Sequence, residues 1–509
     1  MRNLSSPLLV NADPAVRTCS VVATLTTAVW TQGRELRALR GTASGLEIRA
    51  DLTGDLDPDI LRGHNAGELI YNLRSIASGG AFTGSAAERT RRLLAAARKY
   101  DLVELELDRD LTPELLAAIP PHRRRVCWYG QGRDTEGLAA VFGRMAGTGA
   151  RLYLLAPEAE TVEQAAAPLH LLRRLGRTDV TAFATGELGG WTRLLAPWLG
   201  APVVFGGLGH NGAHGLLTVE RLLRDYPFPA LPRLENVFGI VGRRVGESHS
   251  PRLHNAGYRG LDLPALFLPL HANEFTRYWR DLCTELDRLG VPFGGATVVA
   301  PYKEEALLLA DTVSSEASRA GAANLLVRRA GGWRAYTTDP IGVVGALRDS
   351  GIRVSGRRCA VVGCGGAGRG AAAGLLRAGA RTTVVNRGSA RGRYAARLLG
   401  VDYVPLSRFE PEDYELIVHA TPVRDAPPFS VDRVRDDGVL VDLAYGPEET
   451  ELAAAGRRRQ LAVVDGWRVL DVEVARQFRL MTGRAMPMAM ESLEHGGAPA
   501  ALPRREFAR

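Results

Sequence analysis

Short apolar segments alternate with amphipathic helical segments along most of this chain, and this alternation restricts its fold more than any other feature. Strand and helix repeated about eight times within roughly 200 to 250 residues is typical of a closed parallel barrel. The eight candidate strands are Ser20–Leu25, Leu46–Leu52, Glu68–Leu73, Leu102–Leu107, Arg125–Tyr129, Arg151–Ala156, Val180–Ala184 and Pro202–Phe205. We therefore predict an α/β fold that begins with a (β/α)8 barrel over residues 15–228.

A second α/β series follows a proline-rich stretch at residues 226–232. Its candidate strands are Val237–Gly242, Ala265–Leu270, Ala296–Ala300 and Asn324–Arg328. They indicate a small separate domain over residues 235–340. The strand Cys359–Val362 then leads into a glycine-rich turn, a helix and the strand Thr382–Val385, which predicts a Rossmann unit over residues 341–467.

Composition excludes several classes of protein. With 509 residues, 46% hydrophobic and 24% charged, the chain is globular and long enough for two or three domains. The net charge of +8 comes from scattered arginines without interleaved aromatic residues, which argues against nucleic-acid binding. No segment is long and apolar enough to span a membrane, and the five cysteines lack metal-ligand spacing. We expect a cytoplasmic enzyme without a metal, and an oligomer is left open.

Only two lysines, Lys99 and Lys303, stand among the 64 basic residues. Arginine replaces lysine wherever only positive charge is needed, but a guanidinium keeps its proton at any working pH. A lysine amine can be tuned to exchange a proton or to condense with a carbonyl. The few lysines, and the places where a lysine is missing, therefore carry chemical information.

The glycine-rich turn predicts a dinucleotide site. Backbone N–H groups of such a turn and the N-terminus of the following helix can bind a pyrophosphate. The residues concerned are Gly363, Gly365, Gly366, Ala367 and Gly368.

The end of the next strand indicates which dinucleotide binds. Sites for NAD place a carboxylate there, whereas this chain has Asn386 and Arg387, with Arg391 one turn later. Two guanidiniums without an acid favour the 2′-phosphate of NADP. The alternative is that an arginine only covers the surface.

Four motifs of the small domain occur in a specific order ahead of the Rossmann segment: Gly242–Asn255, Ala300–Glu304, Ala320–Asn324 and Thr337–Asp339. In this order the set resembles shikimate dehydrogenase, and the resemblance covers about half the chain. It implies Lys303 and Asp339 as the catalytic pair, Ser248 and Ser250 as ligands of the substrate carboxylate, and Asn324 and Tyr445 as residues of the ring pocket. It also implies that a carboxy-terminal helix at 468–490 completes the substrate-binding domain.

The chemistry agrees with that resemblance. Hydride transfer between a secondary alcohol and nicotinamide needs a group that takes or gives the hydroxyl proton, and an amine beside a carboxylate can do so. Retention of Lys303 in a chain that otherwise avoids lysine favours a chemical role.

Several pocket positions depart from the family pattern. Val299 replaces a threonine, Glu473 a glutamine, Thr337 an asparagine and Glu247 a histidine. A lost hydroxyl and a gained carboxylate would alter the ligand and leave the reaction unchanged. Three small-molecule substrates stay open: shikimate, quinate, or an amino-substituted cyclohexane or cyclohexene carboxylic acid whose ammonium pairs with Glu473.

The barrel resembles type I 3-dehydroquinate dehydratase, which is fused to shikimate dehydrogenase in a known bifunctional enzyme. The resemblance rests on residues 46–51, 73–80 and 186–193. It implies Glu47, Arg49, Arg74 and Arg193 as candidate ligand-binding residues.

The catalytic groups of that family are missing. Leu154 occupies the position of the Schiff-base lysine and Gly130 that of the histidine, and Lys99 lies in an outer helix. Without an amine no imine forms. The barrel is then a degenerate domain, a site that binds a dehydroquinate-like acid, or a site of new chemistry that uses Tyr129, Glu47 or His214.

Together these features predict an NADP-dependent oxidoreductase of a shikimate- or quinate-like acid, with a barrel that lacks the Schiff-base residues. Two alternatives remain. One is a bifunctional dehydratase and dehydrogenase with an altered barrel site, and the other is a metabolite-sensing regulator derived from both enzymes.

Overall fold

The computed structural model describes residues 17–27, 41–63, 67–208, 216–446 and 448–487. The chain divides into two compact units, residues 1–255 with 264–302 and residues 256–263 with 303–509. No helix of the described residues is long and apolar enough to cross a membrane.

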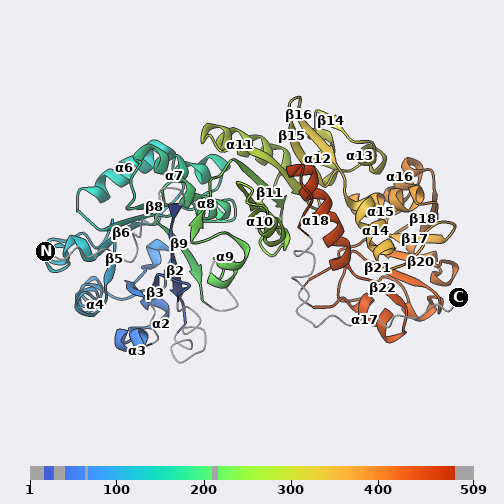
Figure 1. Ribbon diagram of the computed structural model, residues 1–509. Helices are drawn as coiled ribbons and strands as arrows, with labels where there is room; N and C mark the ends of the chain where they lie inside the picture. Colours follow the sequence, from blue (N-terminus) through green and yellow to red (C-terminus); the bar gives the residue numbers. More distant parts are fainter. Residues whose placement is uncertain (1–16, 28–40, 64–66, 209–215, 447, 488–509) are drawn as a thin grey trace. The chain divides into compact units, whose positions relative to one another are not determined.

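Eight parallel strands form the first part of unit 1 (Figure 1). They are β2 (Ser20–Leu25), β3 (Gly45–Arg49), β4 (Glu68–Asn72), β5 (Leu102–Glu106), β6 (Arg124–Trp128), β7 (Leu152–Leu155), β8 (Val180–Ala182) and β9 (Val203–Gly207). Each strand from β2 to β7 pairs with the next, and β9 returns to pair with β2. The rings of Phe183 and Phe205 lie 6.4 Å apart across the remaining gap between β8 and β9. This is the near-closed (β/α)8 barrel that the alternating pattern predicted.

Helices follow these strands, as expected for a parallel barrel. They are α2 (Ala50–Thr53), α3 (Pro58–Gly63), α4 (Ala86–Lys99), α5 (Pro113–Ala118), α6 (Thr135–Ala146), α7 (Val162–Leu175), α8 (Gly190–Leu195) and α9 (Val219–Asp225). Polar side chains cap several of them: Ser85, Asp134 and Thr161 accept backbone hydrogen bonds at the starts of α4, α6 and α7. A two-residue pair, β1 (Arg17–Thr18) with β10 (Ala230–Leu231), joins the ends of this region.

The rest of unit 1 contains three parallel strands in the order β12-β11-β13. They are β11 (Asn236–Gly242), β12 (Ala265–His271) and β13 (Phe293–Val298), with helix α11 (Phe275–Arg288). Helix α10 (Ser250–Gly260) begins in this unit, where the buried Asn255 amide bonds the backbone N–H and C=O of Phe267 in β12.

Unit 2 begins with small elements that carry candidate site residues. They are α12 (Lys303–Leu309), β14 (Thr312–Val313), α13 (Ser315–Ala320), β15 (Leu325–Arg329), β16 (Gly332–Tyr336) and α14 (Asp339–Asp349). Strand β16 pairs antiparallel with β15 and parallel with β14.

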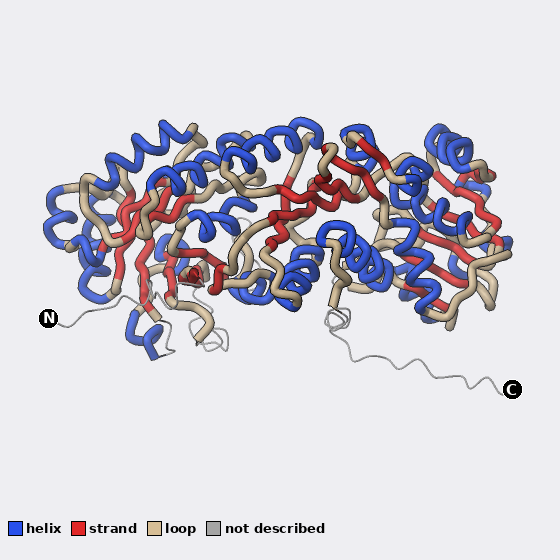
Figure 2. The backbone as a smooth tube through the Cα atoms, turned by 45° about the horizontal axis from the view of Figure 1, so that its top comes forward, coloured by secondary structure: helices blue, strands red, loops and turns tan. Residues whose placement is uncertain are grey.

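A six-stranded parallel sheet follows in the order β19-β18-β17-β20-β21-β22. Its elements are β17 (Arg358–Val362), α15 (Gly366–Arg377), β18 (Arg381–Asn386), α16 (Ser389–Leu399), β19 (Asp402–Pro405), β20 (Leu416–His419), β21 (Val439–Asp442), α17 (Glu451–Arg458) and β22 (Ala462–Val464), followed by α18 (Gly466–Thr482). This strand order reverses beside the first strand, β17, which is the dinucleotide-binding topology. Strands and helices alternate through this region in Figure 2.

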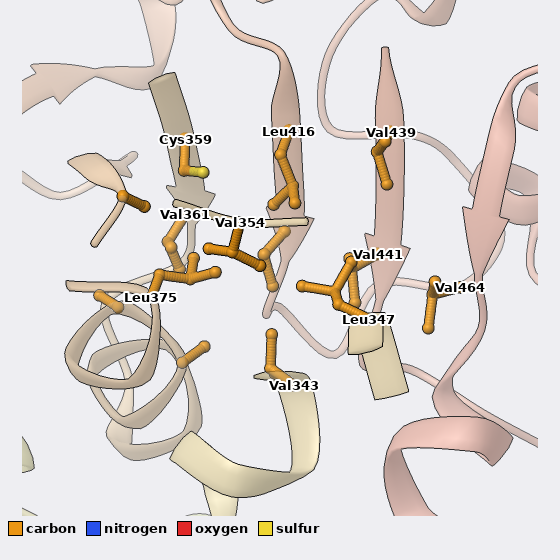
Figure 3. Packing of buried hydrophobic residues seen from close by; sticks show 14 of the residues in the cluster. Val343, Leu347, Val354, Cys359, Val361, Leu375, Leu416, Val439, Val441 and Val464 are labelled. Atoms are coloured by element: carbon orange, nitrogen blue, oxygen red, sulfur yellow. The ribbon is translucent and has the colours of Figure 1, made fainter. Parts of the chain in front are cut away.

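The core of this sheet also fixes α14. Val343 and Leu347 of α14 belong to the same buried hydrophobic cluster as Val361 of β17 and Leu416 of β20 (Figure 3). Helix α15 approaches α14 closely at Gly370, where a Cβ atom would lie 2.6 Å from Cβ of Asp339. The first residue of α14 is thereby held against the helix that follows the glycine-rich turn.

Candidate active site

An amine and a carboxylate meet in unit 2 at the starts of two helices. Lys303 is the first residue of α12 and Asp339 the first of α14. The Lys303 Nζ donates hydrogen bonds to both carboxylate oxygens, 2.7 Å to Oδ1 and 3.0 Å to Oδ2. The two side chains are only 15% and 3% exposed, so the pair is largely removed from water.

Further donors fix the Asp339 carboxylate. Asn324 Nδ2 donates to Oδ1 at 3.0 Å, and Thr337 Oγ1 donates to Oδ2 at 3.2 Å. With the two contacts from Lys303, each oxygen receives two donors, which is the capacity of a carboxylate oxygen. Thr338 Oγ1 accepts from Asn324 at 2.9 Å and from Gln477 of α18 at 3.0 Å. This network holds the carboxylate ready to orient the amine.

A second carboxyl group, Glu473 of α18, lies beside this pair. Burial and the Asp339 carboxylate raise the pKa of Glu473 to about 8, against the opposing effect of Lys303. Burial, with a contribution from Glu473, also raises the pKa of Tyr445 to about 12. The structure therefore brings together four residues that the sequence proposed for the site, Lys303, Asp339, Asn324 and Glu473, with Tyr445 within electrostatic reach.

The glycine-rich turn has the geometry of a phosphate-binding loop. Gly363 has a φ of +111°, which favours glycine, and a Cβ at Gly368 would lie 1.8 Å from the Gly363 carbonyl oxygen. Gly365 caps α15 and faces open space, so a ligand can approach the backbone there. A Cβ at Gly366 would lie 3.0 Å from Cβ of Lys303, which places the loop directly beside the amine.

The end of β18 carries the residues that predicted the cofactor. Asn386 Oδ1 accepts a hydrogen bond from the Cys364 backbone N–H at 3.2 Å and ties this strand to the loop. Arg387 and Arg391 are exposed, and neither has an ion-pair partner in the described part of the chain. Two guanidiniums are therefore available to an anion near the loop.

A buried histidine supports the same edge of the sheet. His419 at the end of β20 bonds Asp442 Oδ1 through Nδ1 at 2.9 Å and Thr421 Oγ1 through Nε2. The methyl group of Thr421 would be 3.0 Å from a Cβ at Gly363. His419 thus holds the segment that packs against the glycine turn.

The remaining proposed substrate residues belong to unit 1. Ser250 is buried at the start of α10, and its backbone N–H donates to Ser248 Oγ at 3.2 Å. Val299 follows β13, and its Cγ2 fills the space that a Cβ on Gly242 would occupy.

The barrel interior contains a buried ion network centred on Arg125, which the sequence argument missed. Its guanidinium binds both Glu47 of β3 and Glu104 of β5. Although burial opposes it, the charges of Arg125 and Arg74 lower the pKa of Glu47 to about 2. Thr24 and Asn72 donate to the same carboxylate at 3.0 and 3.2 Å. Glu47 is therefore fully occupied by groups of the barrel itself.

The three proposed barrel arginines differ in their partners. Arg49 forms a two-point pair with Asp51, at 2.8 and 2.7 Å. Arg74 donates to the Tyr129 hydroxyl at 2.6 Å. Arg193 has no ion pair or hydrogen bond among the described residues and lies 4.6 Å over the Phe183 ring. Burial and the neighbouring Arg74 lower the pKa of Arg193 to about 10, so this is a guanidinium without a counter-charge.

The interior positions of β6 and β7 carry no amine. Tyr153 of β7 contacts the ring of Phe142 in the outer helix α6, so Leu152 and Leu154 face the opposite side by strand alternation. At the end of β6 it is Tyr129 that lies among the interior charges, its hydroxyl 3.1 Å from Glu104 Oε1. Gly130, which the sequence matched to the histidine of the family, is the next residue.

The other two residues considered for barrel chemistry lie elsewhere. Lys99 is exposed at the end of α4, as expected for an outer helix. His214 lies outside the described residues.

Comparison with known proteins agrees with both halves of the chain. Residues 22–229 match the family model for type I 3-dehydroquinase, and residues 240–326 match that for the shikimate dehydrogenase substrate-binding domain. The bifunctional chloroplastic 3-dehydroquinate dehydratase/shikimate dehydrogenase of Arabidopsis thaliana is 26% identical and covers 87% of this chain and 78% of its own length. Shikimate dehydrogenase (NADP(+)) of Syntrophobacter fumaroxidans is 32% identical over 50% of this chain and 90% of its own length.

The chain belongs to the shikimate dehydrogenase family. A crystal structure of shikimate dehydrogenase from Thermus thermophilus, in complex with NADP(H) and shikimate, is 30% identical over 50% of this chain and 96% of that chain, with a TM-score of 0.45. The resemblance stated from the motifs is thus confirmed, together with the α/β fold of barrel and Rossmann sheet.

Proposed function

We propose that this chain is an NADP-dependent oxidoreductase that interconverts a hydroxyl and a ketone on a shikimate- or quinate-like cyclic carboxylic acid. The observation that carries the proposal is the desolvated Lys303–Asp339 pair beside the dinucleotide loop. An isolated ion pair has many structural uses, but an amine within contact of a phosphate-binding turn fits proton transfer coupled to hydride transfer.

Each part of the site then has a task. NADP, when bound, supplies the nicotinamide that accepts or gives the hydride. Lys303 takes the alcohol proton during oxidation and returns it during reduction, while Asp339, fixed by Asn324 and Thr337, keeps the amine in place. By the family resemblance, Ser248 and Ser250 bind the substrate carboxylate. Asn324, Tyr445, Glu473 and Val299 line the ring pocket in the same assignment.

The same reasoning assigns NADP over NAD. Gly365 faces open space and gives the pyrophosphate room, Gly363 and Gly368 let the turn pack closely on itself and its neighbours, and Gly366 and Ala367 begin the helix whose N-terminus faces the ligand. Arg387 and Arg391, exposed and without an ion-pair partner among the described residues, suit a 2′-phosphate. We assign residues 235–340, together with 468–490, to the substrate-binding domain and residues 341–467 to the NADP-binding domain.

A spectrophotometric assay of NADPH formation tests this function. Purified full-length chain is incubated with NADP and, in turn, shikimate, quinate and their amino analogues. We expect turnover with at least one acid and a strong preference for NADP over NAD. Lys303→Ala should abolish turnover while NADP binding persists. Loss of both in a folded variant would indicate that the lysine has only a structural role.

For the barrel, over residues 15–228, we propose non-covalent binding of an acid similar to dehydroquinate. Arg193 is only partly buried, but it has no ion pair among the described residues, and an anionic ligand would supply that partner. The leucines at the interior of β7 leave no amine for an imine. Dehydroquinate should therefore raise the melting temperature of the wild type and not that of Arg193→Met.

Borohydride trapping separates this proposal from a working Schiff-base dehydratase. The wild type treated with dehydroquinate and borohydride should show no mass increase by mass spectrometry. A covalent adduct on Lys99 or at the amino terminus, accompanied by dehydration, would establish the bifunctional alternative. The regulator alternative is disfavoured because a sensor has no need of the intact Lys303–Asp339 pair.

A further inference from the structure

Glu473 is held against the catalytic pair by close helix packing. It lies on α18 where this helix crosses α14, and a Cβ on Gly342 would be 2.5 Å from its Cγ and 2.8 Å from its Oε1. Four residues later on α18, Gln477 bonds Thr338 next to Asp339. Only a glycine at 342 leaves room for this carboxyl beside the first turn of α14.

The charges around Glu473 do not balance if it is ionised. The titratable groups that act on it are Lys303 of α12, Asp339 of α14 and Tyr445 after β21. Lys303 already gives hydrogen bonds to both oxygens of Asp339, and Asp339 takes two further donors. One positive charge therefore faces two carboxyl groups, and no salt bridge to Glu473 occurs among the described residues. Without a further cation, Glu473 keeps its proton and shares a hydrogen bond with the Asp339 carboxylate, so a bound cation would have to take the place of that proton.

We propose that the physiological substrate carries an ammonium group in place of a ring hydroxyl that is not oxidised, and that the Glu473 carboxylate binds this ammonium. This inference rests on the proposed dehydrogenase function and specifies its substrate class. The ammonium supplies the missing positive charge and allows both carboxyl groups to be ionised together. A neutral hydroxyl offers no such compensation and meets a protonated Glu473 near neutral pH.

The pairing predicts a particular dependence on pH. Below about 8 the free Glu473 carries a proton and must release it to bind an ammonium. For an amino substrate, kcat/KM should therefore rise as the pH rises through about 8. For a hydroxy acid the part of this rise that Glu473 causes should be absent, since the ligand gains nothing from the ionised carboxylate.

The experiment compares three substrates in three proteins. The substrates are shikimate and analogues of shikimate in which one or the other non-reacting ring hydroxyl is replaced by an amine. The proteins are the full-length wild type, Glu473→Gln and, as a control, Glu412→Gln, which neutralises an exposed carboxylate paired with Arg433 on the same unit. Glutamine keeps the size of the Glu473 side chain and removes its ability to ionise.

We expect the wild type to prefer one amino analogue over shikimate by about 10- to 100-fold in kcat/KM, the usual worth of a charge-assisted hydrogen bond. Glu473→Gln should reduce kcat/KM for that analogue by a similar factor, reduce the preference for that analogue over shikimate correspondingly, and remove the difference in pH dependence near 8 between the two kinds of substrate. Glu412→Gln should behave as the wild type.

Three results would overturn the proposal. Preference of the wild type for shikimate, lost in Glu473→Gln, would mean that a protonated Glu473 donates to a hydroxyl, and the dehydrogenase function would stand. Equal use of both kinds of substrate, unchanged by the substitution, would remove any role of this residue in specificity. Failure of the folded, NADP-binding wild type to oxidise every ring acid would instead refute the proposed function itself.

Discussion

Placing one methyl group between α14 and α15 should uncouple the catalytic pair. In Gly370→Ala the new Cβ would start 2.6 Å from Cβ of Asp339 and 3.2 Å from its Oδ2, whereas ordinary contacts begin near 3.4 Å. Relief of the clash needs a shift of about 0.8 Å, which would stretch the 2.7 Å bond from Lys303 Nζ to Oδ1 toward about 3.5 Å. That distance is at the outer limit of a hydrogen bond.

Such a displacement has a measurable cost in catalysis. A misplacement of about 1 Å costs on the order of 100-fold in rate, and overpacking costs about 1–3 kcal/mol of stability. We expect kcat of Gly370→Ala to fall about 100-fold while the Kd for NADP changes little, since Gly370 lies beyond the glycine turn.

The matched control adds the same methyl to the other face of α14. In Gly345→Ala the new Cβ would lie 2.7 Å from Cγ1 of Val472, a side chain outside the catalytic pair. Steady-state kinetics, NADP titration and thermal unfolding of both variants complete the comparison. If Gly370→Ala keeps kcat within about threefold of Gly345→Ala, the contact does not position Asp339 and the reasoning fails.

Two further substitutions test the site and a third tests the barrel. Lys303→Met should lower kcat by about 100- to 10,000-fold, the usual contribution of general acid–base catalysis, and Lys99→Met, the matched change at the other lysine, should have no effect on turnover. The double variant Arg387→Ala/Arg391→Ala should bind NADP about 10- to 100-fold more weakly and bind NAD as the wild type does. Fluorescence titration with each cofactor would measure both affinities. Equal weakening of both cofactors would show that these arginines do not bind the 2′-phosphate. Arg193→Met should raise the melting temperature of the ligand-free chain, because it removes a partly buried charge that has no ion pair among the described residues, and a lower value would contradict that account.

The strand pattern was enough to predict the barrel sheet and the first two strands of the Rossmann sheet. All eight predicted barrel strands are present with ends within a few residues, because short apolar runs separated by amphipathic helices have few other solutions. The glycine spacing likewise identified the turn after β17. Local sequence determines these elements, so local patterns suffice to find them.

The face of a strand residue was harder to predict. Tyr129 contacts the interior residue Glu104, whereas the sequence alone matched Gly130, one residue later, to the histidine of the family. A shift of one residue reverses the side of a strand on which a side chain lies. The role of Arg125 also escaped prediction, since its partners Glu47 and Glu104 come from two other strands. The one feature of the sequence that could have indicated this role is that Arg125 is a charged residue inside an otherwise apolar strand.

The surroundings of Glu473 depend on contacts between distant parts of the chain. Its sequence position showed a carboxylate where the family has a glutamine. The approach of α18 to Gly342, and the proximity to Asp339 that raises the pKa of Glu473, follow from the packing of helices more than a hundred residues apart. Sequence reasoning identified the residue, and the structure supplied its electrostatic environment.

The most direct test of the dehydrogenase account follows the hydride itself. The full-length chain is given NADP and a ring hydroxy acid with deuterium on the carbon that bears the reacting hydroxyl, and mass spectrometry reads both products. The account predicts one deuterium in NADPH, one equivalent of ketone, and formation of both products at least about 100-fold more slowly with Lys303→Met. Tight NADP binding without deuterium transfer from shikimate, quinate or either amino analogue would contradict it.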